Sequence, residues 1–390
     1  MKVKVNAMLV TKDIRCIGVN DPDLDLFEEQ YPLQNGMSYN SYMIFDDQIA
    51  VLDTVDRRMI REWLDNLSVA LEGRQPDYLI VQHMEPDHSA GIAVFAEAYP
   101  EARIVATPMA FTMMGRFFGQ SFADRRIAVK EGDSLSLGRH TLTFLAAPMV
   151  HWPEVMVTYD SIDKVLFSAD GFGKFGTTDT DEPWEAEARR YYIGIVGKYG
   201  AQVQALLKKA AALDISAICP LHGPVLRKNL SYYISLYDTW SSYHPESAGV
   251  VIAYTSVYGN TQAVAEALAE KLRQRNCEVA VYNLSRCDWS EAVSAAFRYD
   301  RLVLAATTYN MGIFPPMEHF LLHLTHRGYR KRTVALIENG TWAPAAAKLM
   351  RQLLEKQPDL TFTENTVTLF SSADAGTDSK LDALAEELCR

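Results

Sequence analysis

The spacing of apolar positions divides the chain into two parts with different patterns. In the first part, short apolar runs typical of strands are separated by turns, and helical periodicity appears at 57–71 and 184–196. The strand-like runs are 48–52, 78–82, 141–147, 164–169 and 215–220. From residue 249 onward, five apolar runs alternate regularly with helical stretches. Such alternation predicts a doubly wound parallel sheet in the second part.

The change of pattern falls at residues 242–248, which read SYHPESA. A proline among small polar residues interrupts both helices and strands, so we predict a linker here. It divides the chain into a domain of residues 1–246 and a domain of residues 249–390.

Composition narrows the classes of function. The chain has 390 residues, of which 48% are hydrophobic and 22% charged, as expected for a globular protein with more than one core. Its net charge of −11 argues against nucleic acid as a partner. We expect no signal peptide and no membrane helix, because no apolar run approaches ~20 residues. The five cysteines contain no C-x-x-C pair, so we expect a cytoplasmic protein without a disulfide framework.

The segment 78–91, YLIVQHMEPDHSAG, carries the strongest chemical signal. Four residues with metal-binding side chains follow an apolar strand within six positions, namely His83, Glu85, Asp87 and His88. Pro86 disfavours a helix interior, so we predict a loop, with a helix beginning at Ser89. Imidazole and carboxylate ligands together suit first-row transition metals. The alternative is a solvated polar turn.

Three more candidate ligands follow apolar strands, namely His151, Asp170 and His222. Taken singly, each could instead form a turn or pack against its neighbours. In a layered α/β fold, however, strand ends share an edge, so residues just beyond them can converge. The remaining histidines have no such setting, and we predict surface or structural roles for them: His140, His244, His319, His323 and His326.

In the second domain, residues 254–261, YTSVYGNT, join a strand to a helix. Hydroxyl groups, a glycine and backbone N–H groups at a helix N-terminus form an anion site. The segment matches neither the G-x-x-x-x-G-K-[ST] motif nor G-x-G-x-x-G. The segments 305–312 and 338–342 also follow strands, beside the expected switch point of the sheet. Tyr309 and Trp342 could flank a ring system there.

The order H-x-E-x-D-H, then a distant His, an Asp and a final His-Gly resembles the metallo-β-lactamase superfamily and, more narrowly, the flavodiiron proteins. Glu85 stands where the superfamily's zinc hydrolases usually have a histidine, and a carboxylate there favours iron. The resemblance implies an α/β fold, a metallo-β-lactamase-like αβ/βα sandwich followed by a flavodoxin-like five-stranded sheet. It also implies two iron ions, one held by His83, Glu85 and His151 and the other by Asp87, His88 and His222, with Asp170 bridging.

The second domain resembles flavodoxins, which implies bound FMN. Two of its loops depart from the common family wording, with Thr307 in place of a proline and Glu338-Asn339 in place of Gly-Ser. The FMN-binding residues implied are Thr255, Ser256, Val257, Tyr258, Gly259, Asn260, Thr261, Thr307, Thr308, Tyr309, Asn310, Gly312, Asn339, Gly340, Thr341 and Trp342.

The resemblance implies a flavodiiron oxidoreductase that reduces O2 to water, NO to N2O, or both, with electrons delivered through FMN. A separate donor such as rubredoxin or a reductase is expected, and the two chains of a head-to-tail homodimer would pair FMN with iron. The residues serve either gas equally well. The alternatives are a metal-dependent hydrolase with a regulatory flavodoxin domain and an electron carrier whose metal domain is vestigial.

Overall fold

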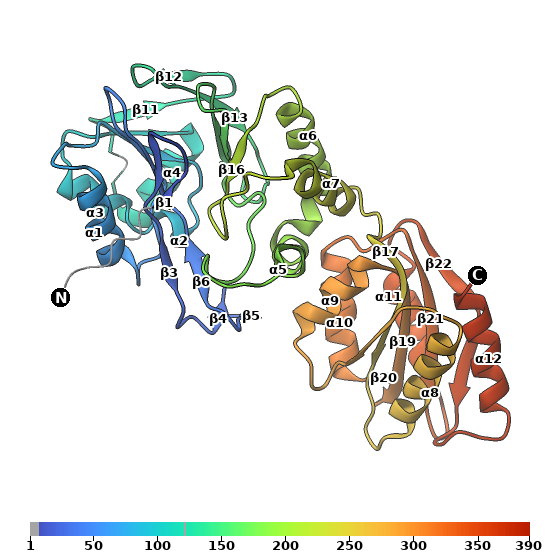
Figure 1. The fold of residues 1–390 in the computed structure, drawn as a ribbon. Helices are drawn as coiled ribbons and strands as arrows, with labels where there is room; N and C mark the ends of the chain where they lie inside the picture. The colour runs from blue at the N-terminus through green and yellow to red at the C-terminus, as the bar shows by residue number, and fades with distance from the viewer. Residues whose placement is uncertain (1–7, 121) are drawn as a thin grey trace. The chain divides into compact units, whose positions relative to one another are not determined.

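The computed structural model describes residues 8–120 and 122–390, which form two compact units (Figure 1). The first contains the described residues up to Tyr192 together with Ala201–Tyr237, and the second contains Ile193–Gly200 and Asp238–Arg390. The chain passes from the last helix of one fold, ending at Ser241, to the first strand of the next, beginning at Ser247. The domain boundaries 1–246 and 249–390 stay a prediction.

A seven-stranded sheet forms one layer of the first unit. Its order is β1 (Met8–Leu9), β2 (Ile14–Cys16), β7 (Tyr42–Ile44), β8 (Ala50–Leu52), β9 (Tyr78–Val81), β10 (Arg103–Ala106) and β11 (Arg126–Ala128). The strands from β8 to β11 are parallel, and the helices α1 (Ile60–Ala70), α3 (Ile92–Ala98) and α4 (Pro108–Phe118) connect them. Strands β7, β8 and β9 are buried along their whole length, which explains their continuous apolar sequences.

The second layer is a five-stranded sheet in the order β12 (Ser134–Ser136), β13 (Thr141–Ala146), β14 (Met156–Asp160), β15 (Val165–Phe167) and β16 (Ala217–Cys219). Helices α5 (Trp184–Tyr191) and α6 (Gly200–Ala210) lie between β15 and β16 in the chain, and α7 (Leu230–Ser241) follows β16. One core cluster contains side chains from both sheets, among them Ile80, Val105, Phe144 and Phe167. The predicted αβ/βα sandwich is therefore confirmed. Two short hairpins complete the unit, β3 (Val19–Asp21) with β6 (Met37–Tyr39) and β4 (Leu26–Phe27) with β5 (Tyr31–Pro32).

The second unit is a parallel sheet in the order β18 (Val279–Asn283), β17 (Ser247–Tyr254), β19 (Tyr299–Tyr309), β21 (Arg332–Asn339) and β22 (Leu360–Leu369). The two-residue strand β20 (Gly312–Ile313) pairs antiparallel with β19. Helices α8 (Asn260–Gln274) and α12 (Thr377–Leu388) pack together on one core cluster, while α9 (Trp289–Arg298), α10 (Pro315–His326) and α11 (Ala346–Leu354) form a second group. The predicted doubly wound sheet is confirmed, and its switch point lies between β17 and β19.

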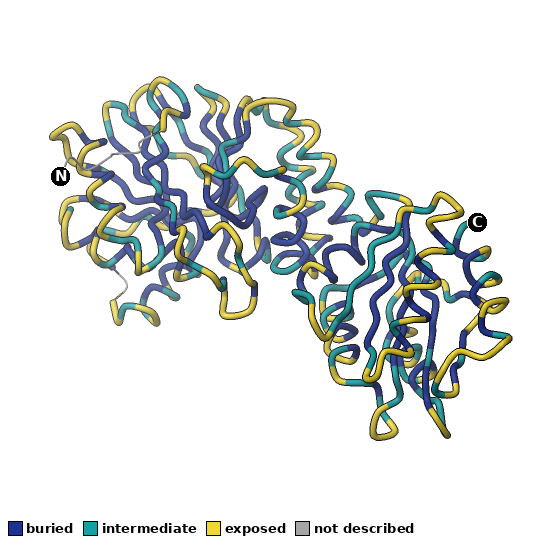
Figure 2. Tube along the Cα trace, turned by 60° about the horizontal axis from the view of Figure 1, so that its bottom comes forward, coloured by how far each residue is buried: buried dark blue, intermediate teal, exposed yellow. Residues whose placement is uncertain are grey.

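Burial follows this layering, because the strands of both units are mainly buried while loops and outer helix faces are exposed (Figure 2). No helix within residues 8–120 and 122–390 has both the length and the apolar character needed to cross a bilayer.

One local prediction was wrong. Residues Pro86–Ser89 form a single helical turn, α2, rather than a loop. Pro86 occupies its first position, where the missing N–H costs nothing because that group would be unpaired in any helix. The next helix begins at Ile92 instead of Ser89.

Candidate metal centre and flavin pocket

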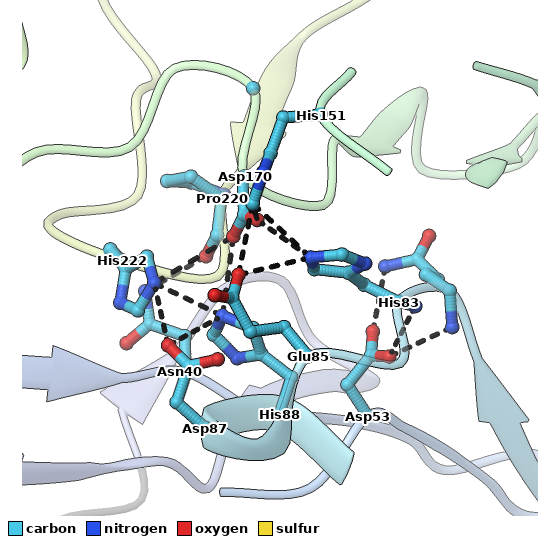
Figure 3. A network of polar contacts seen from close by, with 12 residues as sticks. Asn40, Asp53, His83, Glu85, Asp87, His88, His151, Asp170, Pro220 and His222 are labelled. Carbon is cyan, nitrogen blue, oxygen red and sulfur yellow. Dashed lines mark hydrogen bonds and ion pairs between the residues drawn. The ribbon is translucent and has the colours of Figure 1, made fainter. Parts of the chain in front are cut away.

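The seven predicted ligands converge at one edge of the sandwich (Figure 3). His83 follows β9, and Glu85 caps the helical turn that carries Asp87 and His88. The other three come from the second sheet, where His151 lies between β13 and β14, and Asp170 and His222 follow β15 and β16. Ligands far apart in sequence meet here because both sheets present strand ends to the same edge.

Asp170 lies between two groups of ligands. Its Oδ2 atom lies 3.2 Å from His83 Nε2 and 3.1 Å from His151 Nε2. Glu85 completes this first group, with Oε2 2.9 Å from His151 Nε2 and 3.3 Å from His83 Nε2. Ligands bound ~2.0–2.2 Å from one metal ion lie about 3 Å apart, so these separations fit a single ion.

The other oxygen of Asp170 faces the second group. Asp170 Oδ1 lies 3.2 Å from His88 Nε2 and 3.7 Å from His222 Nε2. Asp87 Oδ2 lies 3.2 Å from His222 Nε2 and 3.3 Å from His88 Nε2, and the two imidazole nitrogens are 3.0 Å apart. The seven side chains thus form two sites joined by one carboxylate.

Burial of unpartnered oxygens indicates that cations belong here. Both carboxylate oxygens of Asp87 and of Asp170 are buried and receive no hydrogen bond. Burial raises the pKa of Asp87 to about 7, opposed chiefly by the neighbouring His88. Two buried carboxylates without donors are costly unless a metal ion neutralises them. The residues therefore fit a pair of metal ions.

Contacts behind the ligands set the orientation of two imidazole rings. His83 Nδ1 donates to Glu154 Oε1 at 2.9 Å, and the same oxygen accepts the Met84 N–H at 2.9 Å. His222 Nδ1 donates to the Ser38 carbonyl at 2.6 Å. Because each Nδ1 carries the proton, each Nε2 presents a lone pair to the site. Glu154 was missed at the sequence level, although it follows His151 by three residues.

Two buried polar residues hold the ligand loops. Asp53 accepts hydrogen bonds from the Gln82 backbone and side chain, at 2.8 Å and 2.9 Å, and fixes the end of β9. The Asn40 amide donates to the carbonyls of Pro220 and Gly223, both at 2.8 Å, and so fixes the turn that carries His222.

A third cluster of metal-type side chains contains Asp13, His140 and Asp163. His140 is buried, and its Nδ1 lies 3.0 Å from Asp160 Oδ2. Of the two predicted roles, surface or structural, this position fits the structural one. The Arg139 guanidinium contacts Asp13 and lies 2.9 Å from His140 Nε2. The Arg139 guanidinium therefore supplies positive charge to this cluster.

In the second unit, a cavity of about 580 Å³ lies at the carboxyl ends of β17, β19 and β21, within the size range of cofactor pockets. Thirteen of the predicted FMN-binding residues line it, namely Ser256, Val257, Tyr258, Asn260, Thr261, Thr307, Thr308, Tyr309, Asn310, Asn339, Gly340, Thr341 and Trp342. The other three predicted residues, Thr255, Gly259 and Gly312, do not line it. Three residues that the motifs did not predict also line it, namely Met311, Ala343 and Ser371.

The two loop departures meet inside this pocket. Thr261 Oγ1 lies 3.1 Å from Thr307 Oγ1 and accepts a hydrogen bond from Asn339 Nδ2 at 3.2 Å. The unusual residues thus join three loops. Glu338 points elsewhere, since its carboxylate accepts from the Ala347 N–H and the Thr368 hydroxyl, both at 2.9 Å.

Gly259 shapes the loop beside the pocket, and two exposed aromatic residues line the pocket itself. Gly259 has φ of +91° immediately before α8, a conformation that turns the loop into the helix N-terminus. Tyr258 and Trp342 are 92% and 85% exposed, so both indole and phenol rings are available to a planar ligand.

The contact between Glu154 and His83 leads to a prediction. Glu154→Ala should weaken metal binding about 10–100-fold, because His83 loses the acceptor that orients its ring. Glu154→Gln should retain most of the affinity, since the single oxygen that accepts both hydrogen bonds is kept. Iron affinity measured by chelator competition, with circular dichroism to verify folding, checks this. Wild-type affinity in Glu154→Ala would contradict it.

Comparison with known proteins agrees with both sites. The profile described as ODP family beta lactamase matches residues 37–223, and a flavodoxin domain profile matches residues 251–371. The chain is 30% identical over 347 residues to the anaerobic nitric oxide reductase flavorubredoxin of Vibrio vulnificus, covering 85% of this chain and 70% of that protein. It is 34% identical over 290 residues to diflavin flavoprotein A 1 of Synechocystis, covering 72% of this chain and 50% of the relative.

Solved structures share the whole fold. Rubredoxin oxygen:oxidoreductase from Desulfovibrio gigas matches with a TM-score of 0.92 at 24% identity, covering 99% of this chain and 98% of that one. The flavodiiron protein from Giardia intestinalis matches with a TM-score of 0.92 at 23% identity, covering 98% and 97%. From the sequence identity to the flavorubredoxin, the two domain matches and this fold, the chain belongs to the flavodiiron protein family.

Proposed function

We propose that this chain reduces O2 or NO at a di-iron centre, with electrons supplied through FMN. The observation that carries the proposal is Asp170, whose two oxygens face two separate groups of buried ligands. Two irons held there would supply direct coordination of a diatomic molecule and single-electron steps. The named relatives, a nitric oxide reductase and a rubredoxin oxygen:oxidoreductase, are the reason for proposing these two gases.

The ligand assignment is part of the proposal. His83, Glu85 and His151 would hold one iron, Asp87, His88 and His222 would hold the other, and Asp170 would bridge them. Glu85 supports iron over zinc, because an additional carboxylate makes the first site harder. Neither a hydrolase nor a vestigial metal domain is favoured, since the relatives are oxidoreductases and all seven side chains converge.

Aromatic side chains pack around two of the ligand histidines, both of which are fully buried. The rings of Tyr191, Phe27 and Tyr39 lie 5.4, 5.7 and 6.0 Å from that of His222. The Trp152 ring lies 5.3 Å from that of His83. In such a setting, the charges of the carboxylates act over a low dielectric and would bind metal ions more strongly than exposed carboxylates do.

FMN would occupy the pocket of the second unit, with its phosphate at the loop 255–261 and the N-terminus of α8. It would supply single electrons to the iron site. We propose that rubredoxin or a reductase supplies the electrons, because one structural neighbour is a rubredoxin oxygen:oxidoreductase. A cytoplasmic location stays a prediction.

The direct test is to load the chain with iron and FMN, reduce it without oxygen and expose it separately to O2 and to NO. We expect two irons and one FMN per chain, and consumption of at least one gas to water or N2O. Asp170→Ala should lose the most iron, because its carboxylate serves both ions, and Glu85→Ala should lose less. Both should keep the flavin spectrum, and His244→Ala, an exposed histidine, is the control. Full iron and activity in either ligand variant would refute the assignment.

The flavin assignment has its own test. Gly259→Val should reduce FMN binding without removing iron, because a branched residue rarely adopts φ of +91° and the loop must move. Thr261→Ala should weaken binding too, since it removes the hydroxyl that joins three loops. Flavin content and iron content are measured on the same samples. Undiminished FMN in Gly259→Val would place the phosphate elsewhere.

We also propose that two chains pair head to tail, so that FMN of one faces the iron pair of the other. The proposal rests on the family resemblance, and two-fold pairs are the commonest soluble oligomers.

A mixed dimer tests this arrangement. One chain carries His83→Ala, which removes iron, and the other carries Gly259→Val, which removes FMN. Head-to-tail pairing places the intact FMN beside the intact iron site, so we expect gas reduction to return when the two variants are combined. Each variant alone is the inactive control. A mixed dimer that retains both cofactors and stays inactive would exclude the arrangement.

A further inference from the structure

An apolar cavity lies behind the ligand loops of the first unit. Its inner part, with room for about 20 Å³, lies between the second sheet and α6, beside Val150, Ser168, Gly171 and Phe172. Its outer part, about 290 Å³, continues between α6 and α7 as far as Leu230 and Ile234. The two parts are adjacent, because the same five residues line both: Leu166, Phe172, Leu207, Ala210 and Leu213.

The walls offer few polar groups to water. Their side chains are almost all aliphatic or aromatic, and the polar groups among them are engaged elsewhere. The Ser168 hydroxyl donates to the Gly171 carbonyl at 2.6 Å, and Lys209 Nζ bonds to Glu131 and to the Ala146 carbonyl, both at 2.8 Å. The Tyr237 hydroxyl accepts the Phe172 N–H at 2.5 Å. Apolar cavities can bind apolar guests such as xenon.

The inner end of the cavity adjoins two predicted iron ligands. Val150 directly precedes His151, while Gly171 and Phe172 directly follow Asp170. The Phe172 ring stacks on Tyr237 with centroids 4.1 Å apart, and both side chains line the inner part of the cavity. A space of about 20 Å³ accommodates one water-sized molecule, which is also the scale of a diatomic gas.

We propose that this cavity takes up an apolar diatomic gas, O2 or NO, and delivers it to the ligand site past Val150 and Phe172. The inference rests on the proposed function and deepens it, because it assigns the gas a route through the protein. Water and ions are excluded from the aliphatic walls, whereas an uncharged diatomic molecule loses little hydration on entering. The cavity thereby concentrates the substrate beside the buried carboxylates of the ligand site. A polar route to the same carboxylates would draw in water instead.

The first measurement uses xenon as the probe. Crystals of the holoenzyme under xenon pressure should show xenon in the outer part, bounded by Leu207 and Ala210. Ala210→Phe should remove it, because Ala210 lines both parts and the larger ring fills them. Ala212→Phe is the matched control, since Ala212 is exposed on the same chain segment and lines neither part. Leu207→Trp provides a second filling variant should Ala210→Phe fold poorly.

The second measurement is the rate of NO and O2 uptake by the reduced holoenzyme in stopped flow. Ala210→Phe should slow uptake about tenfold, equivalent to ~1.4 kcal/mol in the barrier, with unchanged iron and FMN content. Ala212→Phe should match the wild type. Absence of xenon from the wild type, or equal uptake rates in the two variants, would overturn the route. A wild type that takes up neither gas would overturn the proposed function itself, and the route with it.

Discussion

The buried carboxylate of Asp170 is the constraint around which the metal domain is organised. It lies between four imidazole rings, with one oxygen directed to each ligand group, and neither oxygen accepts a hydrogen bond. A buried carboxylate without donors is unstable unless positive charge lies close on both sides. The surrounding architecture supplies the geometry for that charge. Strand ends from both sheets bring ligands to one edge, and Glu154, Ser38 and Asn40 hold the rings and loops in position.

The pocket of the second unit suits an anionic ligand in a different way, with uncharged polar groups. It contains no buried charge of the kind seen around Asp170, and relies on hydroxyl and amide groups at the end of a parallel sheet. Thr261, Thr307 and Asn339 form one hydrogen-bonded group across three loops, in which both unusual residues bond to Thr261. Polar but uncharged walls suit a cofactor that must change its own charge during electron transfer.

The two sites also differ in their exposure to solvent. The flavin pocket is open, with Tyr258 and Trp342 largely exposed, whereas the ligand site is enclosed by aromatic rings and adjoins an aliphatic cavity. An exposed redox group can receive electrons from a partner. A site for an apolar gas benefits from walls that exclude water, because competing solvent is removed without any specific contact to the gas.

The sequence by itself predicted the parallel sheet of the second unit and a set of candidate ligands in the first, whereas the sandwich fold of the first unit was implied by the family resemblance. Periodicity sufficed for the parallel sheet, because alternating strands and helices have few other packings. Metal-binding side chains after apolar strands made His83, Glu85 and Asp170 candidates. The sequence predicted the local backbone wrongly at Pro86. This proline begins a helical turn instead of excluding one, because its missing N–H is harmless at that position. Only the tertiary structure decided that each oxygen of Asp170 faces a different group, that Glu154 orients His83, that Arg139 neutralises the third cluster and that a cavity lies beside Phe172. These features depend on distances between residues remote in sequence, and packing between layers sets such distances whereas periodicity along one strand does not.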